Sequence, residues 1–323
     1  MRINYYLPFT AHTGGVAVIF EHVRILVEQG HDATLTVPSS ELSVDWTSPD
    51  HLVGIDRADQ MPDADVIVAT ASQSVPLVWQ MPPSKGDKFY FVQGYESLWC
   101  GNVDWTYRLP MKKMVVSKWL QGIMSESFGH DSVVVHPAID HETFRPTGSG
   151  GRTGRRVLVM DHVTRLIKGT WVAIQAVELA RRKVPDLELI VFGAAPSENG
   201  FGRVAEWHRH PTSRQLAELY SSCDVFLYPT IADGFSLPPL EAMACGTAVI
   251  TTNHAGTGDW ASPDVCCVVP PHDVRATADA LIEALTDDER RARIAEAGKS
   301  KASEFTRGRM ARELSRAFSH PWA

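Results

Sequence analysis

The sequence lacks any hydrophobic run long enough to cross a membrane. Its apolar runs are short stretches, residues 133–135 among them, whereas a transmembrane helix needs about 18 or more nearly continuous apolar residues. Residues 1–8 also lack the charged segment and the long apolar segment of a signal peptide, and their pattern favours a first β-strand. We therefore expect neither a membrane span nor a cleaved leader.

The chain also lacks paired cysteines and an excess of basic residues. It has 31 Lys and Arg against 38 Asp and Glu, a formal net charge of -7, whereas a dedicated nucleic-acid-binding domain is normally strongly basic. The cysteines form no CxxC pair, and their odd number is typical of reduced thiols in the cytosol; they are Cys100, Cys223, Cys245, Cys266 and Cys267. We therefore expect a cytoplasmic protein with no nucleic-acid partner.

Short apolar runs rich in β-branched residues alternate with helix-length segments in both halves of the chain. In the first half they are residues 3–7, 33–37, 65–70, 88–92, 114–116 and 132–135, and in the second half residues 156–160, 188–192, 225–228, 248–251 and 265–269. Such alternation predicts βαβ units around a parallel sheet. The second half therefore repeats the architecture of the first.

A polar, glycine-rich segment separates the two halves. Residues 147–154 read TGSGGRTG and show no periodicity, which indicates a linker. We therefore expect an α/β fold of two doubly wound, Rossmann-like domains, residues 1–145 and 146–323, that face an interdomain cleft at the carboxyl ends of their strands. The C-terminal helix belongs to the second domain or packs back on the first.

The most informative segment is residues 224–250, DVFLYPTIADGFSLPPLEAMACGTAVI. A predicted strand runs into a glycine-containing loop, and Pro238 and Pro239 suit the first turn of the helix that follows. The backbone N–H groups of residues 234–237 then lie at a helix start, where an anion binds readily. Asp233 and Glu241 flank this position. On spacing alone they could simply complement the helix dipole, but the surrounding sequence favours a ligand site.

This segment resembles the E-x7-E donor-binding motif of family 4 glycosyltransferases (glycosyl transferases group 1) of the GT-B fold. Asp233 stands in place of the first Glu, and Glu241 is the second. Residues 136–146 resemble the interdomain segment of that family, residues 14–16 its N-terminal glycine loop, and Arg165 with Lys168 its phosphate-binding pair. The resemblance implies a GT-B glycosyltransferase that moves a sugar from a nucleotide diphosphate donor to a hydroxyl acceptor, with retention at the anomeric carbon.

The resemblance also implies a role for each matching residue. In that family the second carboxylate holds the donor ribose, the first contacts the sugar, and the loop between them binds the diphosphate. The implied catalytic residues are Arg165, Lys168 and Asp233, and the implied donor-binding residues are Gly14, Gly15, Gly234, Phe235, Ser236, Leu237 and Glu241. From the residues alone, a solvated helix end for the Arg/Lys pair and a tight turn for the two glycines stay open. The nucleotide sugar is a co-substrate, and no cofactor is implied.

Two departures from the family pattern concern the sugar. Many members carry a histidine where this chain has Gln93, which can hydrogen-bond a sugar hydroxyl but cannot act as a general base. We expect Gln93 and Glu96 to contact the acceptor or the transferred sugar. Asp233 shortens the first carboxylate by one methylene. Two alternatives therefore stay open: a catalytically weak sugar-nucleotide-binding homologue that acts as a partner subunit, and a sugar-nucleotide epimerase of the GT-B fold.

Two further motifs could hold a metal. Asp63-Ala64-Asp65 spells the D-x-D that binds a metal in another glycosyltransferase fold, but it directly precedes an apolar run and predicts the start of a strand. His208-Arg209-His210 has no further ligand nearby in the sequence and is interpreted as a polar loop. We therefore expect no metal.

A basic stretch raises the question of membrane contact. Arg108, Lys112, Lys113 and Lys118 alternate with apolar and aromatic residues. They form a solvated helix end, or a peripheral contact with the inner membrane face to which each cation adds about 1 kcal/mol. Related enzymes often use lipid-linked acceptors, so the expected acceptor is a sugar, a lipid-linked sugar or a small molecule.

Overall fold

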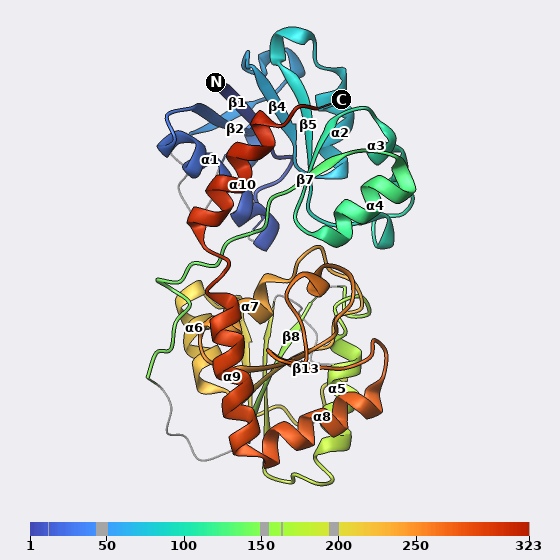
Figure 1. Cartoon of the computed structure of the whole chain (residues 1–323), viewed down its shortest axis with the longest axis vertical. Helices are drawn as coiled ribbons and strands as arrows, with labels where there is room; N and C mark the ends of the chain where they lie inside the picture. The colour runs from blue at the N-terminus through green and yellow to red at the C-terminus, as the bar shows by residue number, and fades with distance from the viewer. Residues whose placement is uncertain (12, 43–50, 149–154, 163, 194–199, 323) are drawn as a thin grey trace. The chain divides into compact units, whose positions relative to one another are not determined.

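The computed structural model describes residues 1–322 apart from 12, 43–50, 149–154, 163 and 194–199 (Figure 1). The chain forms two compact units. The N-terminal unit consists of Met1–Ala138 and Gly308–Ala323, and the C-terminal unit of Ile139–Arg307. The boundary therefore falls at residues 138–139 rather than at the expected 145–146, and the C-terminal helix belongs to the N-terminal unit. Most of the expected linker lies outside the described residues.

The described part of the N-terminal unit holds a parallel seven-stranded sheet with the order β3-β2-β1-β4-β5-β6-β7. The strands are β1 (Arg2–Tyr6), β2 (Asp32–Pro38), β3 (Leu52–Ile55), β4 (Val66–Ala69), β5 (Asp87–Val92), β6 (Lys112–Val115) and β7 (Ser132–Val134). The helices are α1 (Gly14–Glu28), α2 (Val75–Gln80), α3 (Asp104–Arg108), α4 (Lys118–Phe128) and α10 (Arg307–Ser319). Glu313 of α10 pairs with His136 after β7 at 3.0 Å, which ties the end of the chain to this sheet.

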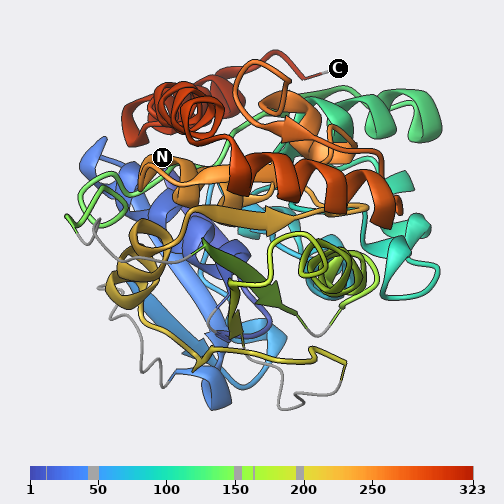
Figure 2. The ribbon, with the colours of Figure 1, turned by 90° about the horizontal axis from the view of Figure 1, so that it is seen from below.

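The described part of the C-terminal unit holds a parallel six-stranded sheet with the order β10-β9-β8-β11-β12-β13. The strands are β8 (Arg155–Asp161), β9 (Leu187–Gly193), β10 (Glu206–Arg209), β11 (Val225–Tyr228), β12 (Ala248–Thr251) and β13 (Cys267–Val268). The helices are α5 (Thr170–Ala180), α6 (Ser213–Ser222), α7 (Leu237–Ala244), α8 (Val274–Thr286) and α9 (Asp288–Ala302). Helix α5 packs against α8, and α7 against α9 (Figure 2).

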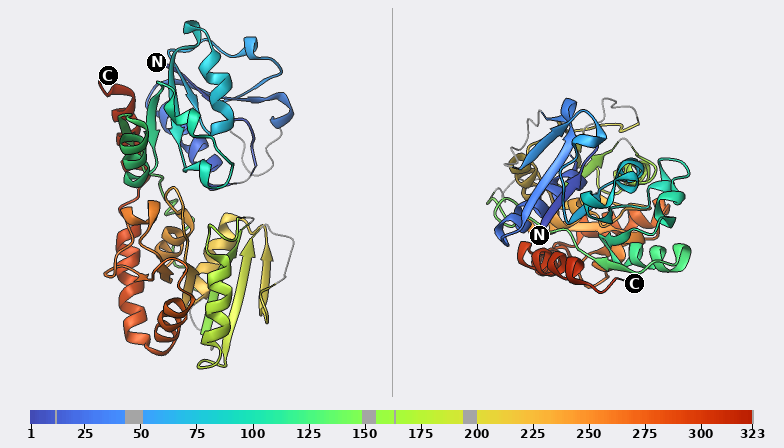
Figure 3. Two further views of the ribbon diagram at one scale, coloured as in Figure 1. Left: turned by 90° about the vertical axis from the view of Figure 1, so that its right-hand side faces the viewer. Right: turned by 90° about the horizontal axis from the view of Figure 1, so that it is seen from above.

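The core of the C-terminal unit follows from the apolar pattern of its elements. One face of α5 is buried at positions that recur with the helix period, Val172, Ala173, Ala176, Val177 and Ala180, and α5 runs alongside the strands (Figure 3). Ala173, Val177 and Ala180 belong to one core cluster with the buried valines of β8 and with Val225 and Leu227 of β11. Helix α6 begins with a capping box, in which the Thr212 hydroxyl accepts from Gln215 N. The helix period and the strand runs of the sequence therefore agree with the packing.

Two strands, β3 and β10, escape the sequence pattern, and both lie at a sheet edge. Strand β10 reads EWHR and is only partly buried, so it lacks the apolar run that marks a central strand. The expectation of a loop at residues 208–210 is therefore wrong in part. His208 and Arg209 belong to β10, where His208 pairs with Glu206 at 3.1 Å.

The strand order of each sheet defines where a ligand is expected. In the N-terminal sheet the order reverses between β1 and β4, and in the C-terminal sheet between β8 and β11. In doubly wound sheets, ligands bind outside the carboxyl ends of the strands at such a switch point. The loops that follow these four strands are therefore the candidate sites. No helix in the described part of the chain is long and apolar enough to span a bilayer.

Candidate functional site

Two loops meet at the switch point of the C-terminal sheet, one after β8 and one after β11. Gly169 ends the first loop with φ 73°, and a Cβ there would lie 1.9 Å from Pro229 O. Only glycine combines this conformation with such a close approach. Ile231 N then donates to Ile167 O at 2.8 Å. The two loops are thus hydrogen-bonded to each other and present their side chains together.

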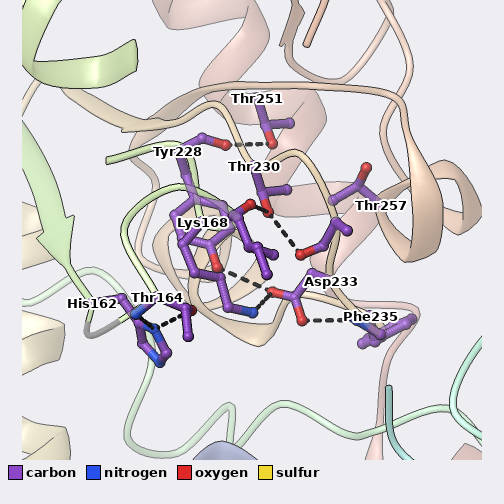
Figure 4. Close-up of polar contacts among 12 residues, drawn as sticks. His162, Thr164, Lys168, Tyr228, Thr230, Asp233, Phe235, Thr251 and Thr257 are labelled. Carbon is purple, nitrogen blue, oxygen red and sulfur yellow. Dashed lines mark hydrogen bonds and ion pairs between the residues drawn. The ribbon is translucent and has the colours of Figure 1, made fainter. Parts of the chain in front are cut away.

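Asp233 organises the polar groups of this site (Figure 4). Its carboxylate lies 2.7 Å from Lys168 Nζ, accepts from the Tyr228 hydroxyl at 3.0 Å and accepts from Gly234 N at 2.8 Å. Burial acts to raise the pKa of Asp233, but the charge and hydrogen bond of the Lys168 ammonium, with the hydroxyl groups of Ser236 and Tyr228, hold it below its usual value. Asp233 is therefore a charged carboxylate held from three sides.

The start of helix α7 supplies backbone donors beside Asp233. Pro238 and Pro239 carry no N–H, so the orphan donors of the first turn come from Ser236 and Leu237. Ser236 is buried and adopts the left-handed conformation at φ 69°. Two hydrogen bonds hold the backbone of this loop. Gly256 N donates to Asp233 O at 3.0 Å, and Trp260 Nε1 donates to Phe235 O at 2.8 Å. A rigid helix start whose first two backbone N–H groups have no intrahelical partner fits an anion.

Glu241 lies further along α7 and has an unusual protonation state. Its carboxylate is partly buried and accepts from the Tyr220 hydroxyl at 3.4 Å. Burial raises the pKa of Glu241 to about 7, and the nearby charge of Asp140 raises it too, against the lowering effect of Tyr220. This carboxyl group can therefore accept hydrogen bonds as an anion only after it loses a proton near neutral pH.

Arg165 and Lys168 have different anionic partners. The Arg165 guanidinium binds Asp161 through two contacts, Nε to Oδ1 at 2.6 Å and Nη2 to Oδ2 at 2.7 Å. It also lies over the rings of Trp171 and Phe201, at 5.4 Å and 5.3 Å from their centroids. Asp161 is fully buried at the end of β8. Arg165 thus neutralises a buried charge, whereas Lys168 faces Asp233.

The N-terminal unit gathers uncharged groups at its own switch point. Gly14 and Gly15 are the first residues of α1, whose Thr13 cap accepts from Val16 N at 3.3 Å, so the tight-turn interpretation of this pair is wrong. A Cβ at Gly15 would lie 3.1 Å from Gln93 Oε1, and Gln93 Nε2 donates to Thr70 O at 3.3 Å. The absence of a side chain at residue 15 therefore makes room for Gln93.

The Glu96 side chain forms hydrogen bonds within the N-terminal unit. Its carboxylate accepts from Ser72 N at 3.1 Å, from Ser72 Oγ at 2.5 Å and from the Tyr90 hydroxyl at 3.5 Å. Burial raises the pKa of Glu96 above its usual value despite these bonds. The carboxylate therefore joins the loop after β4 to the loop after β5, and its contact with an acceptor stays a prediction.

The basic stretch is less exposed than its sequence suggests. Lys113 is fully buried in β6, and its ammonium donates to Leu109 O at 2.7 Å and to Met111 O at 2.8 Å. Burial lowers the pKa of Lys113 to about 8. The prediction of Lys113 as a surface cation is therefore wrong, because the side chain fills the core and caps a turn. Arg108 and Lys118 are exposed, and Lys112 pairs with Asp87 at 2.7 Å.

The carboxylates of the D-x-D triplet both have cationic partners. Asp63 lies 2.9 Å from Lys85 Nζ, and Asp65 lies 2.9 Å from Arg2 Nη2. Strand β4 begins directly after Asp65, as the sequence predicts. Within the described ranges, no group of three or more His, Cys, Asp or Glu side chains could hold a metal ion.

Two side chains of the C-terminal site were not predicted from the sequence. Tyr228 is the last residue of β11, where the sequence predicted only a strand. His162 directly follows β8, and its ring accepts from Thr164 N at 3.1 Å. Neither residue belongs to a motif. The only signal available was that each stands at the carboxyl end of a strand beside the switch point.

Comparison with known proteins supports the interpretation of the C-terminal unit. Residues 148–301 match the family model described as glycosyl transferases group 1. The chain is 31% identical over 199 residues to the D-inositol 3-phosphate glycosyltransferase of Xylanimonas cellulosilytica, an alignment that covers 53% of this chain and 47% of that protein. The chain thus spans about half the length of the curated relatives it matches.

Solved structures resemble the whole chain in fold. The sucrose-phosphate synthase tll1590 of Thermosynechococcus elongatus has a TM-score of 0.82 at 14% identity and covers 99% of this chain and 98% of its own. Anabaena Alr3699/HepE, solved in complex with UDP-glucose, has a TM-score of 0.82 at 13% identity, with 99% of both chains covered. The chain therefore has the GT-B fold, and its residues 148–301 resemble the glycosyl transferases group 1 family.

Proposed function

We propose that this chain is a glycosyltransferase that moves a sugar from a nucleotide diphosphate donor to a hydroxyl acceptor with retention at the anomeric carbon. The observation that carries the proposal is the Lys168–Asp233 pair beside the start of α7, at the switch point of the C-terminal sheet. A fixed cation and backbone donors converge where a doubly wound sheet binds its ligand. The resemblance to proteins that bind or transfer sugars gives the site its substrate class.

The donor diphosphate binds at Lys168 and the N–H groups of residues 236 and 237, and Glu241 binds the ribose. As the bond between sugar and phosphate breaks, negative charge grows on the leaving diphosphate. Donors that are already fixed stabilise this transition state more than the ground state. Asp233 holds Lys168 in place and lies at the sugar end of the loop. This mechanism needs no divalent metal, and the rate of the purified enzyme is expected to survive excess EDTA.

A ligand screen tests the proposal directly. UDP, GDP, ADP and their glucose and mannose esters are each added to the protein in a thermal-shift assay. A ligand at about 100 times its Kd adds roughly 2.7 kcal/mol of apparent stability, so one nucleoside diphosphate should raise the Tm well above the level seen with the matching nucleoside. If none of these compounds changes the Tm or gives heat in calorimetry, the proposal is wrong.

The acceptor side of the proposal rests on the N-terminal unit. Gln93 is partly exposed and anchored to Thr70 O by its amide nitrogen, which leaves its oxygen to accept from a hydroxyl group. Gly14 and Gly15 allow close approach of a ligand to the start of α1. We propose that a sugar hydroxyl of the acceptor binds here, and that Gln93 orients it without removing its proton.

We further propose that the N-terminal unit contacts an anionic membrane surface through Arg108 and Lys118. Both side chains are exposed, and Leu98, Trp99 and Trp105, which precede Arg108 in the sequence, are exposed apolar residues. The double variant R108E/K118E should bind vesicles of phosphatidylglycerol and phosphatidylcholine less than the wild type does, and neither protein should bind phosphatidylcholine alone. Arg214→Glu, on the 90% exposed Arg214 side chain of α6, is the control. Equal binding by the double variant and the control would contradict this contact.

A further inference from the structure

His162 stands at the switch point without a role in the site described above. It directly follows β8, and the loop that it begins leads to Lys168. Its Nδ1 lies 2.7 Å from Thr164 Oγ1 and accepts from Thr164 N at 3.1 Å. A backbone N–H can only donate, so Nδ1 is the unprotonated nitrogen of the neutral ring. The ring proton therefore sits on Nε2.

The ring is close enough to the charges of the site to be affected by them. Burial lowers the pKa of His162, and the Lys168 ammonium lowers it further, while the carboxylates of Asp233 and Asp161 act in the opposite direction. His162 is therefore neutral at physiological pH. Figure 4 shows its ring and Thr164 beside the Lys168–Asp233 pair. Every hydrogen bond that His162 makes within the described part of the chain uses Nδ1.

This arrangement fixes the direction of one donor. Two bonds from Thr164 hold Nδ1, so the opposite side of the ring, with Nε2–H, is the side left to a ligand. The neighbouring group is a lysine, and the helix start of α7 adds further donors. A cation and several N–H donors select an anion with several oxygens, and a hydrogen bond to such an anion is stronger than one to a neutral hydroxyl.

We propose that His162 is a donor-binding residue whose Nε2–H donates a hydrogen bond to the diphosphate of the nucleotide. The inference rests on the proposed function, since it takes the ligand of the C-terminal site to be a nucleoside diphosphate. His162 makes this bond in its neutral form, beside the charge of Lys168, and Thr164 presets the ring for it. The bond then forms without the cost of ordering a free side chain.

Two substitutions of His162 distinguish a role of Nε2 from a role of Nδ1. The amide nitrogen of glutamine can take the place of Nε2, whereas the amide of asparagine reaches only to the position of Nδ1. His162→Asn should weaken binding of the nucleoside diphosphate found in the screen by about tenfold or more, as expected for a lost hydrogen bond to a charged group. His162→Gln should stay within about threefold of the wild type. Inorganic pyrophosphate should follow the same order, and the free nucleoside should bind all proteins alike.

Two control variants show whether the change in nucleotide affinity comes from the His162 ring. His208→Asn, in β10 of the same unit, should bind as the wild type does. Thr164→Val keeps the backbone N–H but removes the hydroxyl, so it should give a loss between those of the two His162 variants. Calorimetry gives the Kd values, and thermal unfolding without ligand shows that each variant is folded.

Three results would overturn the inference. His162→Asn could bind the nucleoside diphosphate as tightly as the wild type, or both His162 variants could lose affinity equally while folded, which would make the ring structural. The loss could also appear with the nucleoside alone, which would place the contact away from the diphosphate. If the wild type itself binds no nucleoside diphosphate, the proposed function fails first, and that outcome is distinct from the other three.

Discussion

The two sheets share one topology, but the carboxyl edges of their switch-point strands carry different chemistry. After β8 and β11, charged side chains pair with one another, as Lys168 does with Asp233 and Arg165 with Asp161. In the N-terminal unit, Gly15 after β1 and Gln93 after β5 are uncharged, and the carboxylate of Glu96 is bonded to Ser72. The fold therefore sets where a ligand binds, and the side chains set its charge.

This difference matches the two substrates of the proposed reaction. A nucleotide diphosphate is an anion, and it needs cations and oriented donors. A hydroxyl acceptor is neutral and needs only hydrogen bonds, so a cation on its side would add a cost of desolvation without a partner. The comparison predicts that substitutions at the C-terminal edge change turnover by orders of magnitude, and substitutions at the N-terminal edge change it by small factors.

The largest effect is expected for Lys168→Ala. Removal of one fixed donor to a developing oxyanion costs about a hundredfold to a thousandfold in kcat, and Asp233 also loses its cation. Release of nucleoside diphosphate from the donor sugar, followed by chromatography, gives the rate. Lys112→Ala removes a lysine at the same ion-pair distance from Asp87, 2.7 Å, in the other unit, and it should leave the rate within about twofold. Equal losses of kcat in the two variants would contradict the proposed difference between the two sheet edges.

Glu241→Gln is expected to abolish a pH dependence of nucleotide binding. Because burial raises the pKa of Glu241 to about 7, the wild type should bind the nucleotide more tightly as pH rises from 6 to 8 and the carboxylate forms. The glutamine variant should bind weakly at every pH, since an amide cannot replace a charged acceptor of two hydroxyl bonds. Calorimetry at each pH gives the affinity.

The Glu241 carboxyl group should also make the stability of the fold depend on pH. Stability without ligand should fall as pH rises, whereas nucleotide affinity should increase. The raised pKa means that the folded chain holds this proton more tightly than the unfolded chain does. The stability that it contributes is full below the ordinary glutamate pKa of about 4.3 and is lost as pH rises through about 7. Relative to the wild type without ligand, Glu241→Gln should therefore gain stability between pH 5 and 8. A constant difference in Tm over this range would contradict the raised pKa.

Substitution of Arg165 tests whether its ion pair with Asp161 also takes part in catalysis. Arg165→Ala leaves the fully buried Asp161 without its cation, and breaking such a pair costs about 3–5 kcal/mol. Adding Asp161→Asn should restore much of the Tm by removing the stranded charge. We expect kcat to stay low in the double variant, because the family resemblance implies that Arg165 contacts the leaving phosphate. Recovery of both the Tm and kcat would mean that Arg165 stabilises the fold and takes no part in catalysis.

Sequence patterns predicted the elements whose residues are buried on both faces. Apolar runs marked β8 and β11, and the period of α5 matched its buried face. The edge strands β3 and β10 were missed because half-exposed strands need no apolar run. The buried Lys113 was misjudged for a related reason. A lysine in a basic stretch suggests exposure, and the turn at Leu109 and Met111 supplies the carbonyls that let its ammonium enter the core.

The candidate site divides in the same way. The helix start, Asp233 and Glu241 lie within one segment, so their spacing was visible in the sequence. Tyr228 and His162 join the site through the pairing of β8 with β11, across more than sixty residues of sequence. A single sequence shows nothing of that pairing, and an isolated aromatic or histidine at a strand end is more often a core residue. Partners brought together by sheet register therefore had to come from the structure.

The smallest effect is expected at the N-terminal edge, from Gln93. Gln93→Ala removes a neutral hydrogen-bonding group, which contributes about 0.5–1.5 kcal/mol, or roughly a two- to twelvefold change in affinity. We expect this loss in the KM for the acceptor, with the Kd of the nucleoside diphosphate unchanged. Gly15→Ala should act on the same contact, because its Cβ would lie 3.1 Å from Gln93 Oε1 and displace the amide. The double variant G15A/Q93A should then be no worse than Q93A alone, since the displaced group is already gone. Additive losses, or a change in nucleotide affinity equal to that of Lys168→Ala, would remove the chemical distinction between the two edges.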